Sequence, residues 1–336
     1  MSDPAGAGAT GAAATGAAAT GAVPDGAGST ATGDSYDVVV IGAGPAGLSA
    51  ALNLVRARRR TLVLDSSRPR NAATLMSHGF VTRDGISPLE LRKLGQVEVE
   101  SYDEGEFQLA VVQSAEPAPG GFTIRAKGVR RAPDREVHAR RILIATGLVE
   151  TLPDLPSIRA YYGTAVHSCM ECDGYEKADE PLFLIGETDD LVERALLLSQ
   201  WSRDIIVFTN GVARIDEAGE RGLASLGIRV DRRPVADIEG ERAVVTGIRM
   251  QDGSVVPRSG GFVRPRYSTA LDFLSGLDLD TDDDGHIAVD AEGRTSHAGV
   301  YAAGDSSQPG PQQLIIAAGF GARAASAINR DLLPVI

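Results

Sequence analysis

The stretch Asp37-Val-Val-Val-Ile-Gly-Ala-Gly-Pro-Ala-Gly47 decides the fold of this chain. Its apolar run, Asp37–Ile41, is typical of a strand that a parallel sheet buries on both faces. A helical pattern follows from about Pro45 to Arg58, and a second strand is expected at Thr61–Leu64. Strand, glycine-rich turn, helix and strand together predict a βαβ unit.

The glycines of this turn, Gly42, Gly44 and Gly47, have the G-x-G-x-x-G spacing. A tight turn, the approach of the backbone to a pyrophosphate and close helix–strand packing each exclude a Cβ atom. The start of the helix then presents its amides and the positive end of its dipole to the phosphates. Asp65, at a strand end 23 residues after Gly42, suits the ribose hydroxyls, so we predict a bound nucleotide.

A second unit of the same plan begins 144 residues further on. Leu182–Gly186 is an apolar strand ending in glycine, followed by a helical pattern over Asp190–Trp201 and a strand at Asp204–Phe208. Near the C-terminus, Gly299–Asp305 repeats the form of a strand followed by glycine and indicates a return to the first domain. The predicted class is α/β, with two Rossmann-like three-layer nucleotide-binding domains, the second inserted in the first.

The expected domain boundaries follow from this order. Residues 35–152 and 263–336 form the first domain, and residues 153–262 form the second, nicotinamide-nucleotide-type domain, which carries the cysteines. Residues 1–34 are rich in Ala, Gly and Thr and bury too little apolar surface to fold, so we expect a disordered tail. The tail lacks Lys and Arg and an unbroken apolar core, so neither a signal peptide nor a transit peptide is expected.

The composition excludes several classes of partner. The 336 residues carry 33 Lys and Arg against 45 Asp and Glu, a formal net charge of −12. Such a chain is unsuited to binding nucleic acid or an anionic membrane surface, because both need clustered cations. No apolar window is long enough to span a bilayer, and we expect a cytoplasmic protein.

Only two cysteines are present, Cys169 and Cys172, in a C-x-x-C arrangement. Two cysteines exclude a secreted disulfide framework, and the spacing indicates a redox-active pair. At the start of a helical turn one thiolate can form while the second thiol lies close enough to close a disulfide. We expect no metal, because zinc would need two more ligands and the acidic run Asp278–Asp284 lacks the calcium-loop pattern.

Further motifs carry a resemblance to a known family. Ile142-Leu-Ile-Ala145-Thr146-Gly147, and Gly304-Asp305 followed by Gln312-Gln313, resemble the second and third FAD contacts of the two-domain disulfide reductases. From about Asp34 to Leu332 the chain resembles the thioredoxin reductase family, which implies FAD as cofactor and a homodimer. The FAD contacts implied are Gly42, Gly44, Pro45, Ala46, Gly47, Asp65, Asn71, His78, Ala145, Thr146, Gly147, Gly304, Asp305, Gln312, Gln313 and Leu314.

The same resemblance assigns roles around the dithiol. Cys172 would exchange electrons with the flavin, Cys169 would be the interchange thiol, and Asp173 would be the general acid and base. Two neighbours depart from the pattern. Glu171 should oppose thiolate formation unless it points to solvent, and His167 either assists proton transfer or is an exposed loop residue.

The second glycine-rich turn has lost its pattern. In Gly186–Leu191, Thr188 and Leu191 replace the second and third glycines, and three carboxylates crowd the place of the pyrophosphate. Thr188 and Asp189 suit helix N-caps instead. No basic residue for a 2′-phosphate follows the next strand before Arg214, so we expect that this domain has lost its nicotinamide nucleotide. The alternative is NADH or NADPH bound through contacts that the sequence does not reveal.

The segment Ser77–Gly85 is similar to the dithiol oxidases that close disulfides in sulfur-containing natural products. The dithiol itself departs from theirs, with Met170-Glu171 in place of Pro-Tyr and Asp173 in place of His. The function expected is oxidation of a dithiol, on a small molecule or a thioredoxin-like protein, through the cysteine pair and FAD to dioxygen. The alternative is a thioredoxin-type reductase fed by NADPH or ferredoxin. A flavin-binding redox sensor is a third reading, for which the chain offers no effector domain.

Overall fold

The computed structural model describes residues 34–307 and 310–335. The predicted disordered tail, apart from Asp34, lies outside the described residues. A search of the described part of the chain finds no helix with the length and apolar character needed to cross a membrane.

The first sheet is built around β1 and β5. Its six strands are β1 (Ser35–Ile41), β2 (Thr61–Asp65), β3 (Gly105–Ala118), β4 (Gly121–Gly128), β5 (Arg135–Ile144) and β16 (Val300–Ala302). β1 is parallel to β2 on one side and to β5 on the other, and β16 is parallel to β5. β3 runs parallel to β2, then β3, β4 and β5 form antiparallel pairs.

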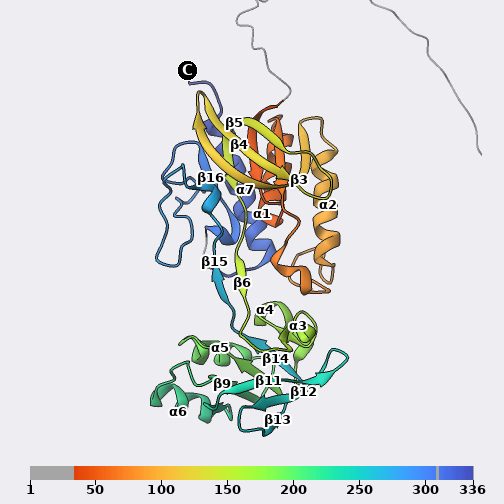
Figure 1. Ribbon diagram of the computed structural model, residues 1–336, viewed down its shortest axis with the longest axis vertical. Helices are drawn as coiled ribbons and strands as arrows, with labels where there is room; N and C mark the ends of the chain where they lie inside the picture. Colours follow the sequence, from red (N-terminus) through yellow and green to blue (C-terminus); the bar gives the residue numbers. More distant parts are fainter. Residues whose placement is uncertain (1–33, 308–309, 336) are drawn as a thin grey trace, which may run out of the picture. The chain divides into compact units, whose positions relative to one another are not determined.

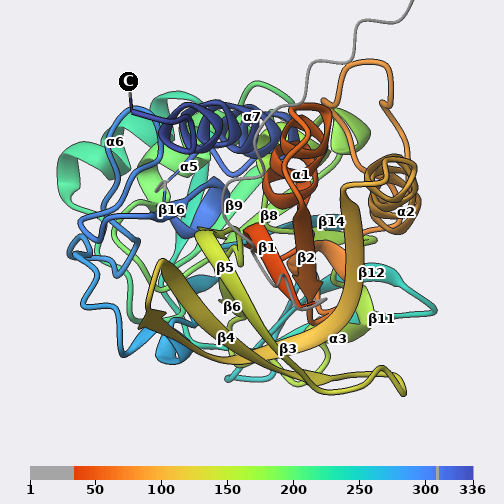
Figure 2. The same cartoon turned by 90° about the horizontal axis from the view of Figure 1, so that it is seen from above.

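Both faces of β1 are buried, which explains its uninterrupted apolar sequence. Val38 and Val40 belong to a core with helices α1 (Pro45–Arg56) and α7 (Leu314–Asp331), whereas Val39 and Ile41 belong to a second core with Phe122. Figure 2 shows α1 and α7 on one side of β1 and β2, and β4 on the other, with α2 (Pro88–Glu100) beside α1. The predicted βαβ unit is confirmed.

The second sheet is parallel throughout. Its strands, in order, are β10 (Arg229–Asp231), β9 (Ile205–Phe208), β8 (Leu182–Ile185), β14 (Gly260–Val263) and β7 (Val166–His167). Helices α5 (Leu191–Leu198) and α6 (Glu217–Ser225) pack on one face of β8 and β9. The other face packs on an antiparallel sheet of β11 (Val235–Glu241), β12 (Val244–Met250) and β13 (Val255–Pro257).

Two strands connect the segments that build these sheets. β6 (Val149–Thr151) follows β5 of the first sheet, β15 (Arg266–Ser268) follows β14 of the second, and the two pair antiparallel (Figure 1). The remaining short elements are η1 (Arg70–Ala73), α3 (Ile158–Tyr161), α4 (Met170–Asp173), η2 (Tyr175–Lys177), η3 (Asp272–Leu274) and η4 (Gly304–Ser306).

Several predicted bounds need correction. Helix α1 ends at Arg56 rather than Arg58, and α5 covers Leu191–Leu198 rather than 190–201. The predicted N-caps of α5, Thr188 and Asp189, are wrong. Asp190 occupies the N-cap position and its side chain caps no amide, because it accepts hydrogen bonds from Thr188 and Arg264 instead.

Candidate active site

One cavity of about 970 Å³ collects nearly all of the predicted site residues. The glycine-rich turn after β1, the ends of β5 and β16, the start of α7 and the two cysteines all line it. Of the predicted residues, Gly47 alone lies outside the lining. Those that line the cavity are Gly42, Gly44, Pro45, Ala46, Asp65, Asn71, His78, Ala145, Thr146, Gly147, Cys169, Cys172, Asp173, Gly304, Asp305, Gln312, Gln313 and Leu314.

The first glycine-rich turn is open where a phosphate would lie. A Cβ atom on Gly44 would meet no atom within 4 Å, whereas one on Gly42 would lie 2.4 Å from the oxygen of Ala145. A Cβ atom on Gly47 would lie 1.9 Å from the oxygen of Gly42. Gly42 and Gly47 therefore permit close backbone packing, and Gly44 leaves an open cradle at the start of α1. This cradle fits the pyrophosphate of FAD.

The carboxylate of Asp65 holds the same turn in place. Its Oδ1 accepts a hydrogen bond from the amide of Ala43 at 3.0 Å, and its Oδ2 accepts from the amide of Ser67 at 2.9 Å. Arg92, on α2, also donates to Oδ2. No motif marks Arg92, which lies 27 residues from Asp65 in the sequence, on α2. A ribose hydroxyl at Asp65 would share the carboxylate with this guanidinium.

Arg70 is a second cavity residue that the sequence analysis missed. Its guanidinium donates to Asp305 Oδ2 at 2.6 Å and to Gln312 Oε1 at 2.7 Å, and it lies over the ring of Tyr267. Burial raises the pKa of Asp305, and the charge of Arg70 opposes that rise. Arg70 thus joins the glycine–aspartate pair after β16 to the start of α7.

Thr146 supplies an independent sign that a polar ligand belongs in the cavity. Its hydroxyl oxygen is buried and has no hydrogen-bond partner, although the residue lines the cavity. Buried hydroxyls in native proteins are satisfied in the great majority of cases. Together with the cradle at Gly44, this hydroxyl indicates that the residues present fit a bound dinucleotide.

Cys169 and Cys172 form a disulfide, with their Cα atoms 5.3 Å apart. Cys169 is the N-cap of the single-turn helix α4, so the predicted position at the start of a helical turn is confirmed. Glu171, between the two cysteines, is exposed. Water therefore screens its charge, and its opposition to a thiolate is weakened.

His167 is buried on β7, with 8% of its surface exposed, so the exposed-loop alternative is wrong. Its Nδ1 lies 3.2 Å from Asp173 Oδ1, and its Nε2 lies 2.8 Å from the carbonyl oxygen of Thr164. Because a carbonyl oxygen only accepts, Nε2 must carry a hydrogen. Nδ1 and Oδ1 are close enough for a proton to pass between them, and Asp173 directly follows Cys172.

The carboxylates of the second turn are all engaged by neighbouring groups. Glu187 accepts hydrogen bonds from Asn210 at 2.9 Å and from Arg266 at 2.7 Å. Asp190 accepts from Thr188 and, at 2.8 Å, from Arg264. Burial would raise the pKa of Asp190, but the hydrogen bond from Thr188 and the charge of Arg264 lower it on balance.

Side chains also fill the space above the first glycine of the second turn. A Cβ atom on Gly186 would lie 2.7 Å from Leu191 Cδ2 and 2.9 Å from the Cβ of Arg264. At the matching place of the first turn, the close neighbour is backbone, and the next glycine is open. The two turns share one plan in sequence, but their surroundings differ.

A disulfide that shares a cavity with an open dinucleotide cradle can exchange an electron pair with a bound redox nucleotide. This arrangement is that of a nucleotide-dependent disulfide oxidoreductase. The family model of the pyridine nucleotide-disulphide oxidoreductases matches residues 36–321. The chain therefore belongs to this family, in its thioredoxin reductase branch, and is an FAD-dependent disulfide oxidoreductase.

Individual relatives support the same assignment. A crystal structure from Bacillus anthracis assigned to thioredoxin reductase TrxB is 36% identical, with a TM-score of 0.82, and the match covers 88% of this chain and 98% of that one. The crystal structure of HlmI is 37% identical, also with a TM-score of 0.82, over 89% and 92% of the two chains. Thioredoxin reductase sirT from Leptosphaeria maculans is 29% identical over 313 residues, covering 89% of this chain and 94% of the relative.

Proposed function

We propose that this enzyme oxidises dithiols to disulfides and passes the electrons to dioxygen. The observation that carries the proposal is the second glycine-rich turn, where Thr188 stands at the place of the open Gly44. Arg264 and Leu191 pack against Gly186, and Arg264 is held there by an ion pair with Asp190. We infer that this turn offers a nicotinamide nucleotide no cradle, so that the electrons come from the substrate.

The thiol chemistry needs only the two cysteines and the substrate. A substrate thiolate attacks the sulfur of Cys169, the Cys169–Cys172 bond breaks, and a mixed disulfide with Cys169 forms. The second substrate thiol then attacks the substrate sulfur of that mixed disulfide. The substrate leaves as a disulfide, and the two cysteines hold the electron pair as a dithiol. Bound FAD supplies the two-electron acceptor for this dithiol, and dioxygen then takes the pair to give hydrogen peroxide.

The His167–Asp173 pair lies where it can donate a proton to the sulfur that leaves. When the disulfide opens, Cys172 departs as a thiolate, and the adjacent pair can protonate it. The same pair takes the proton back when the dithiol is reoxidised. His167 is held by the carbonyl of Thr164 and by the ring of Phe262, with centroids 6.0 Å apart, so its orientation is fixed before substrate arrives.

We also propose the FAD contacts, the domain division, the homodimer and the cytoplasmic location that the sequence predicts. The residues that would hold FAD are those of the Gly44 cradle, Asp65, Thr146, Asp305 and the start of α7. The domain division at residues 35–152, 153–262 and 263–336, the homodimer and the cytoplasmic location belong to the same proposal.

The test is anaerobic titration of the purified yellow protein. NADPH, NADH and a dithiol such as dithiothreitol are added separately while the flavin absorbance is followed. The proposal expects bleaching by the dithiol alone, then recovery of colour with one hydrogen peroxide per dithiol when air is admitted. Fast bleaching by NADPH, with no peroxide from dithiol and air, would overturn it.

A thioredoxin-type reductase is the second candidate, because several relatives bear the name thioredoxin reductase. In that case electrons would run from NADPH, or from ferredoxin, through the cysteine pair to a thioredoxin-like protein. It predicts that NADPH or reduced ferredoxin bleaches the flavin and that an added protein disulfide restores the colour without oxygen.

A further inference from the structure

Arg194 lies beside the dithiol, in the same cavity. It comes from the second turn of α5, and its Nη2 donates a hydrogen bond of 2.9 Å to the carbonyl oxygen of Ser168, the residue before Cys169. Arg194 lines the cavity together with Thr188, Leu197 and both cysteines. A guanidinium is thus placed within reach of a molecule that reacts at Cys169.

Arg194 makes no direct ion pair with a carboxylate among the described residues. Its Nε is buried without a hydrogen-bond partner, and among residues 34–307 and 310–335 no carboxylate oxygen pairs with it within 4.0 Å. Asp190, the N-cap residue of α5, attracts Arg194 from a distance but is itself bound by Thr188 and Arg264. Burial and the like charge of Arg264 lower the pKa of Arg194, and the charge of Asp190 opposes them.

A buried cation without a counter-charge is costly, and such groups concentrate at sites where a ligand completes them. Arg258 is an arginine of this chain whose charge is balanced by a carboxylate. Arg258 is buried, whereas Arg194 is partly buried. The Nε of Arg258 also lacks a partner, but its Nη1 lies 3.1 Å from Asp204 and it does not line the cavity. Arg194 differs from it by facing the cavity and lacking the carboxylate.

We propose that Arg194 binds an anionic group of the substrate, so that the enzyme prefers small dithiols that carry a carboxylate. A carboxylate in the cavity would pair with the guanidinium and balance its charge, and guanidinium–carboxylate hydrogen bonds are among the strongest in proteins. Arg194 lines the same enclosed cavity as the two cysteines, which favours a small molecule over a folded protein. This inference rests on the proposed dithiol oxidation and adds its substrate class.

The test compares two dithiols that differ only in charge. Dihydrolipoate ends in a carboxylate and dihydrolipoamide in the neutral amide. We expect the wild-type holoenzyme to prefer dihydrolipoate by about tenfold or more in kcat/KM, since a hydrogen-bonded ion pair commonly contributes that much. Arg194→Gln should bring the ratio close to one, Arg194→Lys should keep part of it, and the matched control Arg258→Gln should keep it in full.

A binding measurement separates this inference from the oxidase proposal. Calorimetry with the oxidised forms, lipoate and lipoamide, needs no turnover, and lipoate should bind more tightly only when Arg194 is present. Equal binding, or no binding of either compound, would overturn the inference even if the oxidase reaction is confirmed. It would also be overturned if Arg194→Gln lowered both kcat/KM values equally, because Arg194 would then only hold Ser168. The same holds if that variant slowed flavin bleaching by NADPH, because the anion would then be a cofactor phosphate.

Discussion

Ser168, the residue before the dithiol, is held from two sides. Arg194 donates to its carbonyl oxygen, and its hydroxyl donates to the hydroxyl oxygen of Tyr162, 2.8 Å away. Tyr162 donates its one hydrogen to Glu150 at 2.6 Å, and burial together with that carboxylate raises the pKa of Tyr162. The phenol therefore stays protonated and keeps donating to Glu150. Ser168 is thus held through both its backbone and its side chain, while the cysteines line the cavity.

The two cysteines should differ as nucleophiles. If Cys169 exchanges with substrate, Cys172→Ser leaves it free to attack a disulfide with no partner to release the product. We expect that Cys172→Ser forms a stable mixed disulfide with dithionitrobenzoate and releases one thionitrobenzoate per chain. Cys169→Ser should react at least about tenfold more slowly. Mass spectrometry of both adducts checks the assignment, and faster reaction of Cys169→Ser would reverse the two roles.

Breaking the contact between His167 and Asp173 should slow the reaction without unfolding the protein. His167→Gln keeps a group that can donate to the carbonyl of Thr164 but cannot hold the transferable proton. We expect the anaerobic bleaching of flavin by dithiothreitol to slow by about 100-fold, the lower end of general acid–base effects.

The control for this variant is His138→Gln. His138 is a histidine bonded to a backbone carbonyl, at Pro119, outside the cavity. Its substitution should leave the stopped-flow trace as in the wild type. If His167→Gln and His138→Gln behave alike between pH 6 and pH 9, the pair plays no part in proton transfer.

At the scale of elements, the turn between β1 and α1 allows two neighbouring glycines to be compared. Gly47→Ala would place a methyl group 1.9 Å from the oxygen of Gly42, and such overpacking costs about 1–3 kcal/mol or more. Gly44→Ala meets nothing within 4 Å and should leave the fold intact. Its methyl group would instead fill the phosphate cradle.

We therefore expect one alanine variant to lose thermal stability and the other to lose FAD. Gly47→Ala should lower the melting temperature of the flavin-free chain, and Gly44→Ala should not. Gly44→Ala should purify with much less FAD per chain, as read from the ratio of visible to ultraviolet absorbance. Full FAD content in Gly44→Ala would show that the cradle does not hold the cofactor.

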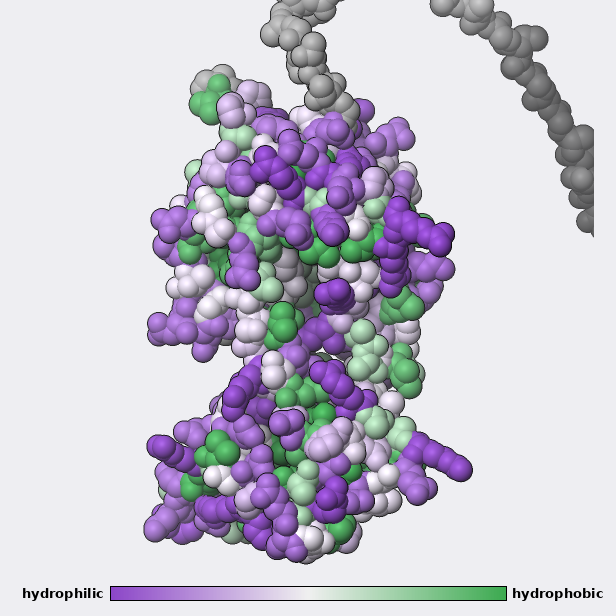
Figure 3. All heavy atoms as spheres, in the orientation of Figure 1, coloured by the Kyte–Doolittle hydropathy of each residue, from purple (hydrophilic) through white to green (hydrophobic). Residues whose placement is uncertain are grey.

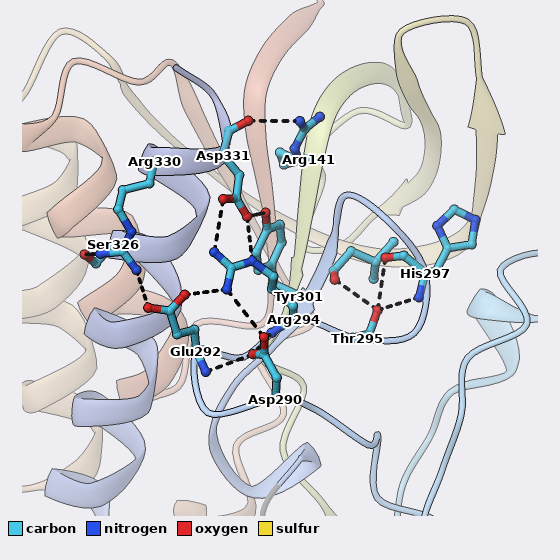
Figure 4. A network of polar contacts seen from close by, with 11 residues as sticks. Arg141, Asp290, Glu292, Arg294, Thr295, His297, Tyr301, Ser326, Arg330 and Asp331 are labelled. Carbon is cyan, nitrogen blue, oxygen red and sulfur yellow. Dashed lines mark hydrogen bonds and ion pairs between the residues drawn. The ribbon is translucent and has the colours of Figure 1, made fainter. Parts of the chain in front are cut away.

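The end of α7 is joined to the preceding loop by a network centred on Arg294 (Figure 4). Arg294 pairs with Asp331, Asp290 and Glu292, and Tyr301 donates to Asp331. The Arg294 hydrogen bonds lower the pKa of Asp331, and burial and that carboxylate raise the pKa of Tyr301 to about 12. The network fixes the helix whose other end lines the cavity.

This network predicts a pH-dependent stability. A carboxylate whose folded-state pKa is lowered stabilises the fold above its unfolded pKa, near 4, and this stabilisation is lost as the pH falls through the folded value. The melting temperature of Arg294→Gln should therefore lie several degrees below that of the wild type at pH 7. The gap should narrow as the pH falls below about 4. A gap that stays constant from pH 7 to pH 3 would rule out this electrostatic origin.

At the scale of the whole molecule, sequence periodicity was informative where one local rule decides the structure. The buried strand β1 and the glycines after it follow from valine runs and absent Cβ atoms. The contacts of Arg70, Arg92 and Arg194 could not be read in that way. Each reaches a partner 26 to 242 residues away, and an arginine in a helix carries no signal of what its guanidinium will meet.

The sequence misjudged the second turn in part for the same reason. Its three carboxylates led us to predict a turn hostile to a phosphate, but the arginines that pair with two of them come from β15 and the residues before it, more than 70 residues later. A turn that appears overcharged in sequence is internally compensated in the fold. The N-cap prediction failed because the Thr188 hydroxyl donates to Asp190 and the Asp189 carboxylate accepts from the amide of Arg214.

The proposed homodimer needs an apolar surface that can outweigh repulsion between two chains of net charge −12. Exposed large apolar side chains gather between residues 75 and 97, where Leu75, Val81, Leu89 and Val97 are 67%, 70%, 73% and 57% exposed. Figure 3 shows green side chains over the segment that Figure 1 draws in orange. Leu89 and Val97 lie two turns apart on α2, so they share a face that a second copy could cover.

We expect Leu89→Glu to shift the protein from dimer to monomer in light scattering after size-exclusion chromatography. Val244→Glu is the matched control, because Val244 is 62% exposed on β12, outside this segment, and its substitution should leave the dimer intact. Since like charge opposes association, the wild-type dimer should tighten when salt rises from about 20 mM to 200 mM. If Leu89→Glu is still a dimer at low salt, the contact lies on another surface. If the wild-type protein is a monomer at micromolar concentration, the homodimer is wrong.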